Sequence, residues 1–355
     1  MNGSQKSIYI NMFIWRDDRI GNQISSELLK AADRGVNVHI SKDKLGAVFE
    51  KAEENKQSFF HKEFNLGLHF KSFICDKFYP MKGKVKSRKQ EYNELVEVLI
   101  NHPNITVDKN HLKGDHSKYY IFDDKTLIIG GINIEDKEIY TDVEGKRYYD
   151  YMVELDDETY VEKFKKRVYR GEEFEVDNRV EFLFNVKRNG ETSYEAKESI
   201  LKIISCADRS LDIVMAYIGD QEVTEKIIEV ANRGIAVNMI LPAKSNIQED
   251  LNKRVLKQIM KRTNNKVKVY LSQGMVHAKL VRVDDRILTL GSTNLNKRAM
   301  ENLLELNVVI NIDNQALVKT LNNSLAEIMD NSKRIDDSSE LKYNPLKALL
   351  EVIAC

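Results

Sequence analysis

The sequence predicts an α/β fold made of two halves with the same topology. A nine-residue segment, Ala32–Ile40, resembles a second segment, Ala231–Met239, and a second pair of matching blocks follows further along each half. In both halves an apolar run typical of a β-strand precedes an amphipathic stretch with helical spacing. Strand–helix–strand units of this kind usually pair their strands in parallel through a right-handed crossover, so we expect a parallel pair of strands in each half.

The first half begins on a predicted strand, Ile8–Trp15, which an amphipathic helix follows. The apolar residues on one face of that helix are Ile24, Leu28 and Ala31. Gly35 stands where a helix ends in a residue of positive φ. The offset between the halves falls from 199 residues in the first pair of blocks to 161 in the second, so the first half carries 38 additional residues. We place this insertion near residues 45–88.

The second half has its own predicted core strand, Leu211–Tyr217, and its own helix-ending glycine, Gly234. It also has a predicted strand and helix upstream, Val180–Val186 and Tyr194–Cys206, without a counterpart in the first half. The charged, helix-like segment Glu158–Arg170 lies between the two halves. We therefore predict an N-terminal half over residues 1–175 and a C-terminal half over residues 176–355.

The composition excludes several classes of protein. At 355 residues the chain is long enough for two domains. Its composition, 42% apolar and 31% charged residues, fits neither a disordered chain nor a membrane bundle. Lys and Arg together number 55, as do Asp and Glu, so the net charge is zero. This excludes a globally basic nucleic-acid binder, although a locally basic groove stays open.

The cysteines and the apolar runs bear on the compartment. Cys75, Cys206 and Cys355 are far apart and odd in number, which favours a reducing environment over a disulfide framework. No apolar run reaches the roughly 18–20 residues of a membrane span, and Met1–Ser7 lacks the apolar stretch of a secretory signal. We expect a cytoplasmic protein whose membrane contact, if any, is peripheral.

The second pair of blocks carries the reactive residues. The pattern His-x-Lys-x4-Asp occurs at His116–Asp123 and again at His277–Asp284. Six residues separate each aspartate from a glycine turn that ends in asparagine, Asn133 in one half and Asn294 in the other. One such match would be weak, but two matches with the same downstream spacing are specific.

The spacing of these motifs has a direct chemical meaning. Histidine and lysine at positions i and i+2 of a strand point to the same face, so imidazole and ammonium converge. The aspartate pairs Asp123-Asp124 and Asp284-Asp285 provide turn chemistry before a second strand. Two copies around one pocket would gather two His, two Lys and two Asn. Such a pocket suits an anionic tetrahedral centre, because the lysines are cations, the asparagines are neutral donors and the histidines move protons near neutral pH.

These residues resemble the phospholipase D superfamily, whose signature is this duplicated motif, and the resemblance extends from Ile8 to about Ile312. Within the superfamily the chain is most similar to the cardiolipin synthase branch, through Gly130–Asn133, Tyr149–Leu155 and Arg34–Val36. The resemblance implies two halves related by a pseudo-two-fold axis, each a mixed β-sheet flanked by helices, with the active site at their interface. It also implies metal-independent phosphodiester chemistry through a covalent phosphohistidine, so neither a metal nor a cofactor is expected.

The resemblance assigns roles to the motif residues. One histidine must be neutral to attack phosphorus and the other protonated to supply the leaving alkoxide. By resemblance His116 is the nucleophile and His277 the general acid, a choice that the residues alone do not make. The groups expected to hold the non-bridging phosphate oxygens are Lys118, Lys279, Asn133 and Asn294.

Four acidic residues complete the predicted catalytic set. An acid behind each imidazole would fix its tautomer, and Asp150 and Glu305, each lying past its own motif, are the candidates. Asp123 and Asp284 close the two motifs, and we expect them to hold the turn and the motif's own backbone rather than to touch substrate.

The insertion bears on the membrane partner. Six of the 13 phenylalanines fall in Phe59–Phe78, and five basic residues follow within Lys82–Lys89. Aromatic rings beside a basic run suit an interfacial contact with an anionic membrane surface. A packed subdomain with a solvated basic loop is the alternative.

The leading functional prediction is a phosphatidyltransferase of cardiolipin synthase type acting on phospholipid, with phosphatidylglycerol the favoured substrate. A phospholipase D that hydrolyses phospholipids to phosphatidic acid is the first alternative, and a nuclease or phosphodiesterase with the same core is the second. The zero net charge and the aromatic insertion weigh against a nucleic-acid partner. A lipid-binding scaffold would be expected to lose a motif residue, and none is lost. The oligomeric state stays open.

Overall fold

The computed structural model describes residues 1–52, 58–61, 67, 93–140, 148–172, 177–188 and 191–354. The chain forms two compact units, Met1–Tyr140 with Val153–Val176, and Thr141–Met152 with Asp177–Cys355. The division after Val176 falls beside the predicted boundary. The short segment Thr141–Met152 belongs to the second unit, which the sequence did not indicate.

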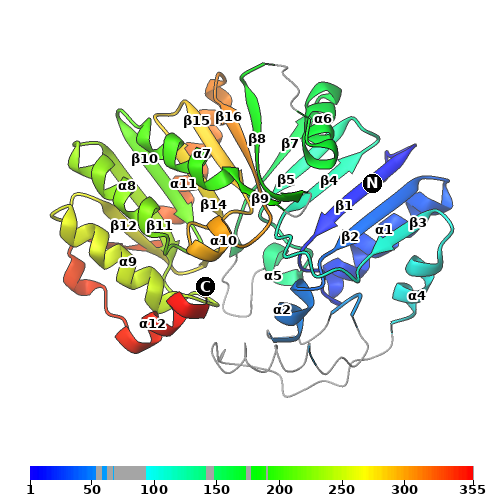
Figure 1. The fold of residues 1–355 in the computed structure, drawn as a ribbon, viewed down its shortest axis with the longest axis horizontal. Coiled ribbons are helices and arrows are strands. Elements are labelled where there is room, and N and C mark those ends of the chain that lie inside the picture. Colours follow the sequence, from blue (N-terminus) through cyan, green and yellow to red (C-terminus); the bar gives the residue numbers. More distant parts are fainter. Residues whose placement is uncertain are drawn as a thin grey trace. The chain divides into compact units, whose positions relative to one another are not determined.

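The first unit contains a mixed six-stranded sheet in the order β3-β2-β1-β4-β5-β7 (Figure 1). Its strands are β1 (Ser7–Met12), β2 (Asn37–Lys42), β3 (Ile105–Asp108), β4 (Lys118–Phe122), β5 (Thr126–Gly130) and β7 (Met152–Asp156). Its helices are α1 (Arg19–Asp33), α2 (Gly46–Ala52), α4 (Glu94–Asn101), α5 (Asp136–Ile139) and α6 (Glu158–Lys165), which a π-helical turn, Lys166–Arg170, extends. The predicted charged helix between the halves is thus confirmed, as part of the first unit.

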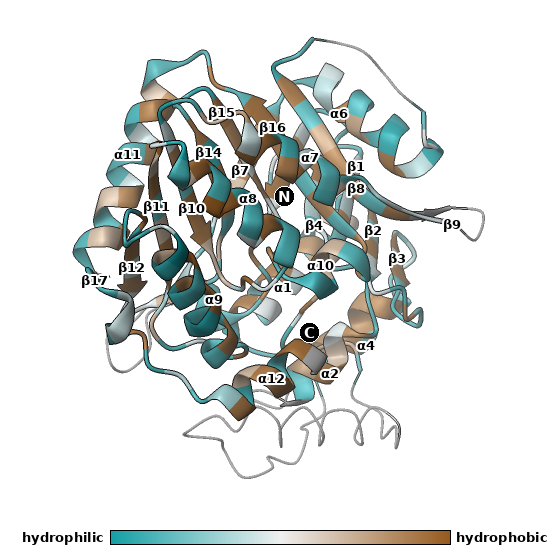
Figure 2. Cartoon of the chain, turned by 60° about the vertical axis from the view of Figure 1, so that its left-hand side comes forward, coloured by the Kyte–Doolittle hydropathy of each residue, from teal (hydrophilic) through white to brown (hydrophobic). Residues whose placement is uncertain are grey.

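The second unit contains a mixed nine-stranded sheet in the order β17-β12-β11-β10-β14-β15-β16-β8-β9. Its strands are β8 (Val180–Arg188), β9 (Glu191–Tyr194), β10 (Ser210–Met215), β11 (Ala236–Pro242), β12 (Lys268–Ser272), β14 (Lys279–Val283), β15 (Ile287–Gly291), β16 (Glu305–Asn311) and β17 (Ser332–Ile335). Its helices are α7 (Glu195–Ser205), α8 (Gln221–Asn232), α9 (Glu249–Arg262), α10 (Lys297–Glu301), α11 (Gln315–Asp330), the 3-10 turn Ser338–Glu340 and α12 (Pro345–Ala354). In Figure 2 the apolar strands of this unit lie between α8 and α9 on one face and α11 on the other.

The two sheets repeat one topology, as predicted. β1 pairs in parallel with β2 across α1, and β10 pairs in parallel with β11 across α8. Gly35 and Gly234 end those helices with φ of +93° and +90°, the left-handed conformation that favours glycine. The hairpin that carries the motif, β4–β5 in one unit and β14–β15 in the other, lies antiparallel beside β1 and β10, respectively. The predicted additional strand and helix of the second half are also confirmed, as β8 and α7.

One segment of the second unit comes from the middle of the chain. The short strand β6 (Tyr148–Tyr149) pairs in parallel with β13 (Met275–Val276), just before the second motif. The chain then enters β7, in the sheet of the first unit. This arrangement places the residues around Asp150 beside His277.

The predicted insertion is described only in part. Phe59 and Phe60 are buried, with ring centroids 5.9 and 5.2 Å from that of Trp15, so these two aromatics belong to the core of the first unit. The other aromatics of Phe59–Phe78 and the basic run Lys82–Lys89 lie outside the described residues. Among the described residues, no helix is both long enough and apolar enough to span a membrane.

Candidate active site

The first motif begins just before β4. Lys118, the first residue of that strand, is fully buried and donates a hydrogen bond from Nζ to the carbonyl oxygen of His116. The ring of Phe13, which follows β1, meets the half-buried His116 imidazole edge-on with centroids 4.8 Å apart. The Lys118 Nζ lies 5.4 Å from the centroid of the same ring. Phe13 therefore orders both the histidine and the lysine.

A polar network fixes the backbone on either side of His116. The Asp43 carboxylate accepts from the backbone N–H groups of Lys113, at 3.1 Å, and Asp115, at 2.7 Å. Asp115 in turn accepts from the Ser117 N–H at 3.0 Å, and Asn11 donates to the Ser117 carbonyl at 3.0 Å. Burial raises the pKa of the Asp115 carboxyl above its ordinary value. These side chains thus help to hold the backbone of the segment that presents His116.

The second motif is held differently. The backbone N–H groups of His277 and Ala278 both donate to the Tyr149 carbonyl, at 2.9 and 3.0 Å. Lys279 is buried and donates from Nζ to the carbonyl oxygen of His277, as Lys118 does to His116. Pairing of β13 with β6 therefore helps to hold the backbone that presents His277.

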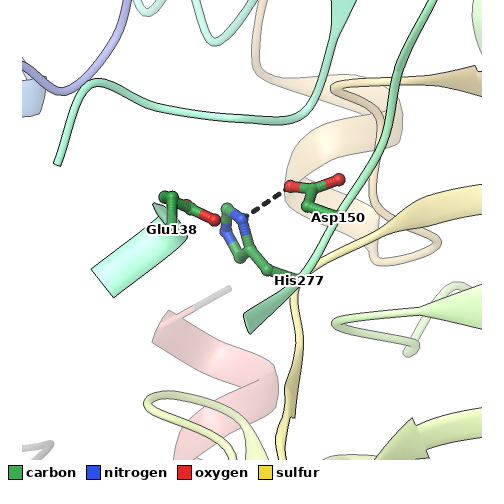
Figure 3. A group of neighbouring side chains, drawn as sticks. All are labelled: Glu138, Asp150 and His277. Atoms are coloured by element: carbon green, nitrogen blue, oxygen red, sulfur yellow. Dashed lines mark hydrogen bonds and ion pairs between the residues drawn. The ribbon is translucent and has the colours of Figure 1, made fainter. Parts of the chain in front are cut away.

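Asp150 lies behind the second imidazole (Figure 3). Its Oδ2 is 2.9 Å from Nδ1 of His277 and 3.5 Å from Nζ of Lys279, and its side chain is buried. A carboxylate on Nδ1 fixes the tautomer, stabilises the imidazolium and leaves Nε2 for proton transfer. We predicted that Asp150 lies behind His116, and the structure contradicts that partner. Asp150 was paired with the histidine of its own half, and the β6–β13 pairing instead brings it to His277.

Glu305, the other predicted acid, begins β16 and is buried against the glycine turn of the second motif. Ser292 donates its hydroxyl hydrogen bond to the Glu305 carboxylate and accepts the backbone N–H of Leu306 at 3.0 Å. Asn294, at the end of that turn, and Asn133, its counterpart in the first unit, are both buried. The Oδ1 atoms of these two asparagines lack a hydrogen-bond partner within the described structure. Each of these amide oxygens therefore has an unused acceptor site, whereas Nδ2 of Asn133 lies 3.5 Å from Oε1 of Glu138.

Asp123 and Asp284 hold strands together, at a distance from the histidines. The Asp123 carboxylate accepts from the backbone N–H groups that open β1, of Gln5, Lys6 and Ser7, at 2.7–2.9 Å. The Asp284 carboxylate accepts from those of Asp208, Arg209 and Ser210, which open β10, at 2.7–3.0 Å. Each aspartate comes five residues after its lysine, about 16 Å of extended strand. The expected turn is present, but each aspartate holds the backbone of the neighbouring strand rather than that of its own motif. This placement excludes a direct catalytic contact of either aspartate.

The electrostatics of these two aspartates fit that role. Burial alone would raise the pKa of Asp284, but the backbone donors Ser210, Asp208 and Arg209 together with the Arg286 guanidinium outweigh it and hold that pKa well below its ordinary value. The pKa of Asp123 is lowered too, because its backbone donors likewise outweigh burial. Asp123 and Asp284 have φ of +53°, and the residues after them +58° and +57°, as in a two-residue hairpin turn.

The sequence prediction missed the residues that order the histidines. These residues are Phe13, Asn11, Asp115 and Ser117. The sequence indicates them only because the two halves differ at these positions. At the repeat offset of 161, Asp115 and Ser117 correspond to Val276 and Ala278, both apolar.

The family comparison matches most of the chain. The family described as "Cardiolipin synthase, PLD-like domain" matches residues 1–170 and 200–329. The chain belongs to this family. Cardiolipin synthase B of Salmonella typhi is 22% identical to this family member over 354 residues, covering 94% of the chain and 78% of the relative. Cardiolipin synthase of Clostridium perfringens strain SM101 is 24% identical, covering 90% of the chain and 65% of the relative.

Solved structures support the same fold. Phosphatidylserine synthase from Haemophilus influenzae aligns with a TM-score of 0.71 at 17% identity, covering 99% of this family member and 88% of that structure. Polyphosphate kinase from Porphyromonas gingivalis aligns with a TM-score of 0.54 at 14% identity, covering 48% of that structure. Proteins named for different reactions share this fold, so the fold by itself does not select a substrate.

Proposed function

We propose that this protein is a phosphatidyltransferase of cardiolipin synthase type that works through a covalent phosphohistidine. The observation that carries the proposal is the pair of intact motifs, in which each lysine is buried against the backbone of its histidine and His277 bears a carboxylate on Nδ1. The family match and the cardiolipin synthase relatives support this reaction class.

The proposed reaction has two balanced steps on one phosphodiester. Nε2 of His116 attacks phosphorus, a P–N bond forms, the P–O bond to the leaving glycerol breaks, and the His277 imidazolium gives its proton to the leaving oxygen. The hydroxyl of the acceptor lipid then loses its proton to His277 and attacks phosphorus, which breaks the P–N bond and frees His116. The Asp150 carboxylate supports the acid–base role of His277, because it favours the protonated ring.

The groups proposed to hold the phosphate are the motif lysines and asparagines. Buried Lys118 and Lys279 supply positive charge as it is needed, and the side chains of Asn133 and Asn294 supply neutral donors. Phosphatidylglycerol as donor and acceptor, and attachment to an anionic membrane from the cytoplasmic side, are part of the proposal. These parts of the proposal are supported by the names of the family and its relatives, which refer to cardiolipin.

Incubation with phosphatidylglycerol vesicles, followed by mass spectrometry of the lipids, tests this function. We expect cardiolipin and free glycerol in equal amounts from the wild type and neither product from His116→Ala. Phosphatidic acid without cardiolipin would instead assign hydrolysis, and no turnover of any phospholipid would overturn the proposal.

A further inference from the structure

Helix α12 exposes an apolar face. Nine large apolar or aromatic side chains are exposed among the described residues, and four of them lie on this ten-residue helix. Leu346 is 67% exposed and Leu349 51%, and Leu350 and Val352 are also exposed. Leu346, Leu349 and Leu350 have the spacing i, i+3, i+4 and so share one side of the helix. A concentration of this kind marks an interaction surface rather than scattered surface leucines.

The orientation of α12 is fixed through its other side. The buried Glu351 carboxylate accepts the backbone N–H of Leu251, in the first turn of α9, at 2.7 Å. Asp250 of the same turn accepts the backbone N–H of Asn344 at 2.7 Å and forms an ion pair with Lys347 at 3.1 Å. The helix therefore docks on the N-terminal end of α9 through polar groups, where the helix dipole favours a carboxylate. The leucines face away from the contact that holds the helix in place.

Basic and aromatic residues accompany the leucines. Lys342 is exposed, Lys347 keeps 45% of its side chain exposed, and the Lys257 ammonium lies 5.9 Å from the centroid of the Tyr343 ring. A short helix with leucines on one side and lysine and tyrosine at its edge suits the boundary between headgroups and acyl chains of an anionic bilayer.

We propose that α12 binds the surface of an anionic lipid bilayer with Leu346, Leu349 and Leu350 inserted below the headgroups. This inference rests on the proposed phospholipid substrate, which a protein must reach at a bilayer. It is independent of the predicted insertion, because α12 belongs to the other unit.

A tryptophan placed on the helix tests the insertion directly. The chain has a single tryptophan, Trp15, and it is fully buried, so an introduced indole is read against a constant background. Leu349→Trp is the probe, and Val98→Trp, at an exposed position of α4 in the other unit, is the matched control. With phosphatidylglycerol vesicles we expect a blue shift of emission and quenching by brominated acyl chains for Leu349→Trp only. An unchanged Leu349→Trp spectrum, or a blue shift without vesicles that grows with protein concentration, would overturn the proposal, the second by indicating a second copy of the chain.

Removal of the apolar face tests its contribution to binding. We expect the triple variant Leu346→Ser, Leu349→Ser, Leu350→Ser to bind phosphatidylglycerol vesicles at least roughly tenfold more weakly, at low and at high salt, because apolar burial is not screened by ions. Val98→Ser should bind as the wild type does. Turnover of a small soluble phosphodiester should be unchanged in both variants. Equal sedimentation of the triple variant and the wild type would overturn the proposal. The same measurements on a His116→Ala background separate binding from chemistry, because this variant should bind vesicles without turnover. A wild type that binds vesicles but turns over no phospholipid would contradict only the proposed function.

Discussion

The two motif histidines differ in their surroundings although their motifs are alike. His277 is buried, its backbone N–H is bonded to Tyr149, and its Nδ1 contacts Asp150. His116 is packed against Phe13 in a segment that Asp115 and its polar partners hold. A carboxylate on one ring nitrogen favours the protonated form of that ring, which agrees with the general-acid role that the family resemblance gives to His277.

The Asp150→Asn variant tests this assignment. We expect turnover of phospholipid to fall by about 100-fold or more, because a general acid contributes about 10²–10⁴-fold when the leaving group needs a proton. A p-nitrophenyl phosphodiester leaves without one, so its burst of p-nitrophenol should be nearly intact. Asp156→Asn, which removes an exposed carboxylate six residues later, is the control and should match the wild type on both substrates. Equal losses on the two substrates would instead give Asp150 a purely structural role.

The covalent intermediate distinguishes the histidines independently. With the same activated substrate, His277→Ala should still form a phosphohistidine, whereas His116→Ala should form none. Mass spectrometry of peptides from the quenched enzyme checks both outcomes. A wild-type adduct mapped to His277 would reverse the two roles and leave the chemistry unchanged.

At the scale of elements, the aspartate that closes each motif connects a hairpin to the start of the neighbouring strand, β1 in one unit and β10 in the other. Asp284 joins the β14–β15 turn to the start of β10, and its lowered pKa makes this tie dependent on pH. A carboxyl whose pKa is lower in the folded than in the unfolded chain stabilises the fold at pH values above the unfolded pKa, here near 3.8. That stabilisation is lost as the pH falls from there towards the pKa of the folded state.

Asp284→Asn should therefore lower the free energy of unfolding at pH 7 by about 2–4 kcal/mol, since a hydrogen bond to a charged group is worth about 1.5–3 kcal/mol. The difference from the wild type should shrink in urea titrations carried out at or below pH 3. Asp285→Asn is the matched control in the same turn. It keeps a residue that tolerates positive φ, and it removes a carboxylate that is 48% exposed, so it should cost no more than about 1 kcal/mol. A loss for Asp284→Asn that is the same at pH 3 and pH 7 would contradict this account.

The repeat made most of each sheet predictable, because alternating and helical patterns in both halves pointed to the same elements. The hairpins, the parallel pairs, β8 and α7 followed from local patterns and from the offsets of 199 and 161 residues. The pairing of β6 with β13 joins residues more than 120 positions apart, and a two-residue strand carries no period that a sequence reveals. The partner of Asp150 depended on that pairing, and so it was assigned to the wrong histidine.

At the scale of the whole molecule, positive and negative charges are equal in number. Because 55 basic residues are balanced by 55 acidic ones, we expect a phosphodiester to be bound by particular side chains rather than attracted by the net charge. Lys118 and Lys279 are buried beside their histidines, and within water-excluded sites such charges act far more strongly than at the surface.

This placement predicts that turnover does not need a divalent cation. We expect activity on phosphatidylglycerol vesicles to be unchanged, within about twofold, after dialysis against EDTA, because the buried lysines offset the charge that builds on the phosphate. Lys279→Met should lose about 10²–10³-fold, and added Mg²⁺ should not restore it, since the variant removes the charge that acts at the phosphate. Lys333→Met removes an exposed lysine of the same unit and should retain full turnover with and without chelator. Loss of wild-type activity in EDTA that returns with Mg²⁺ or Ca²⁺ would refute the assignment of the phosphate charge to Lys118 and Lys279.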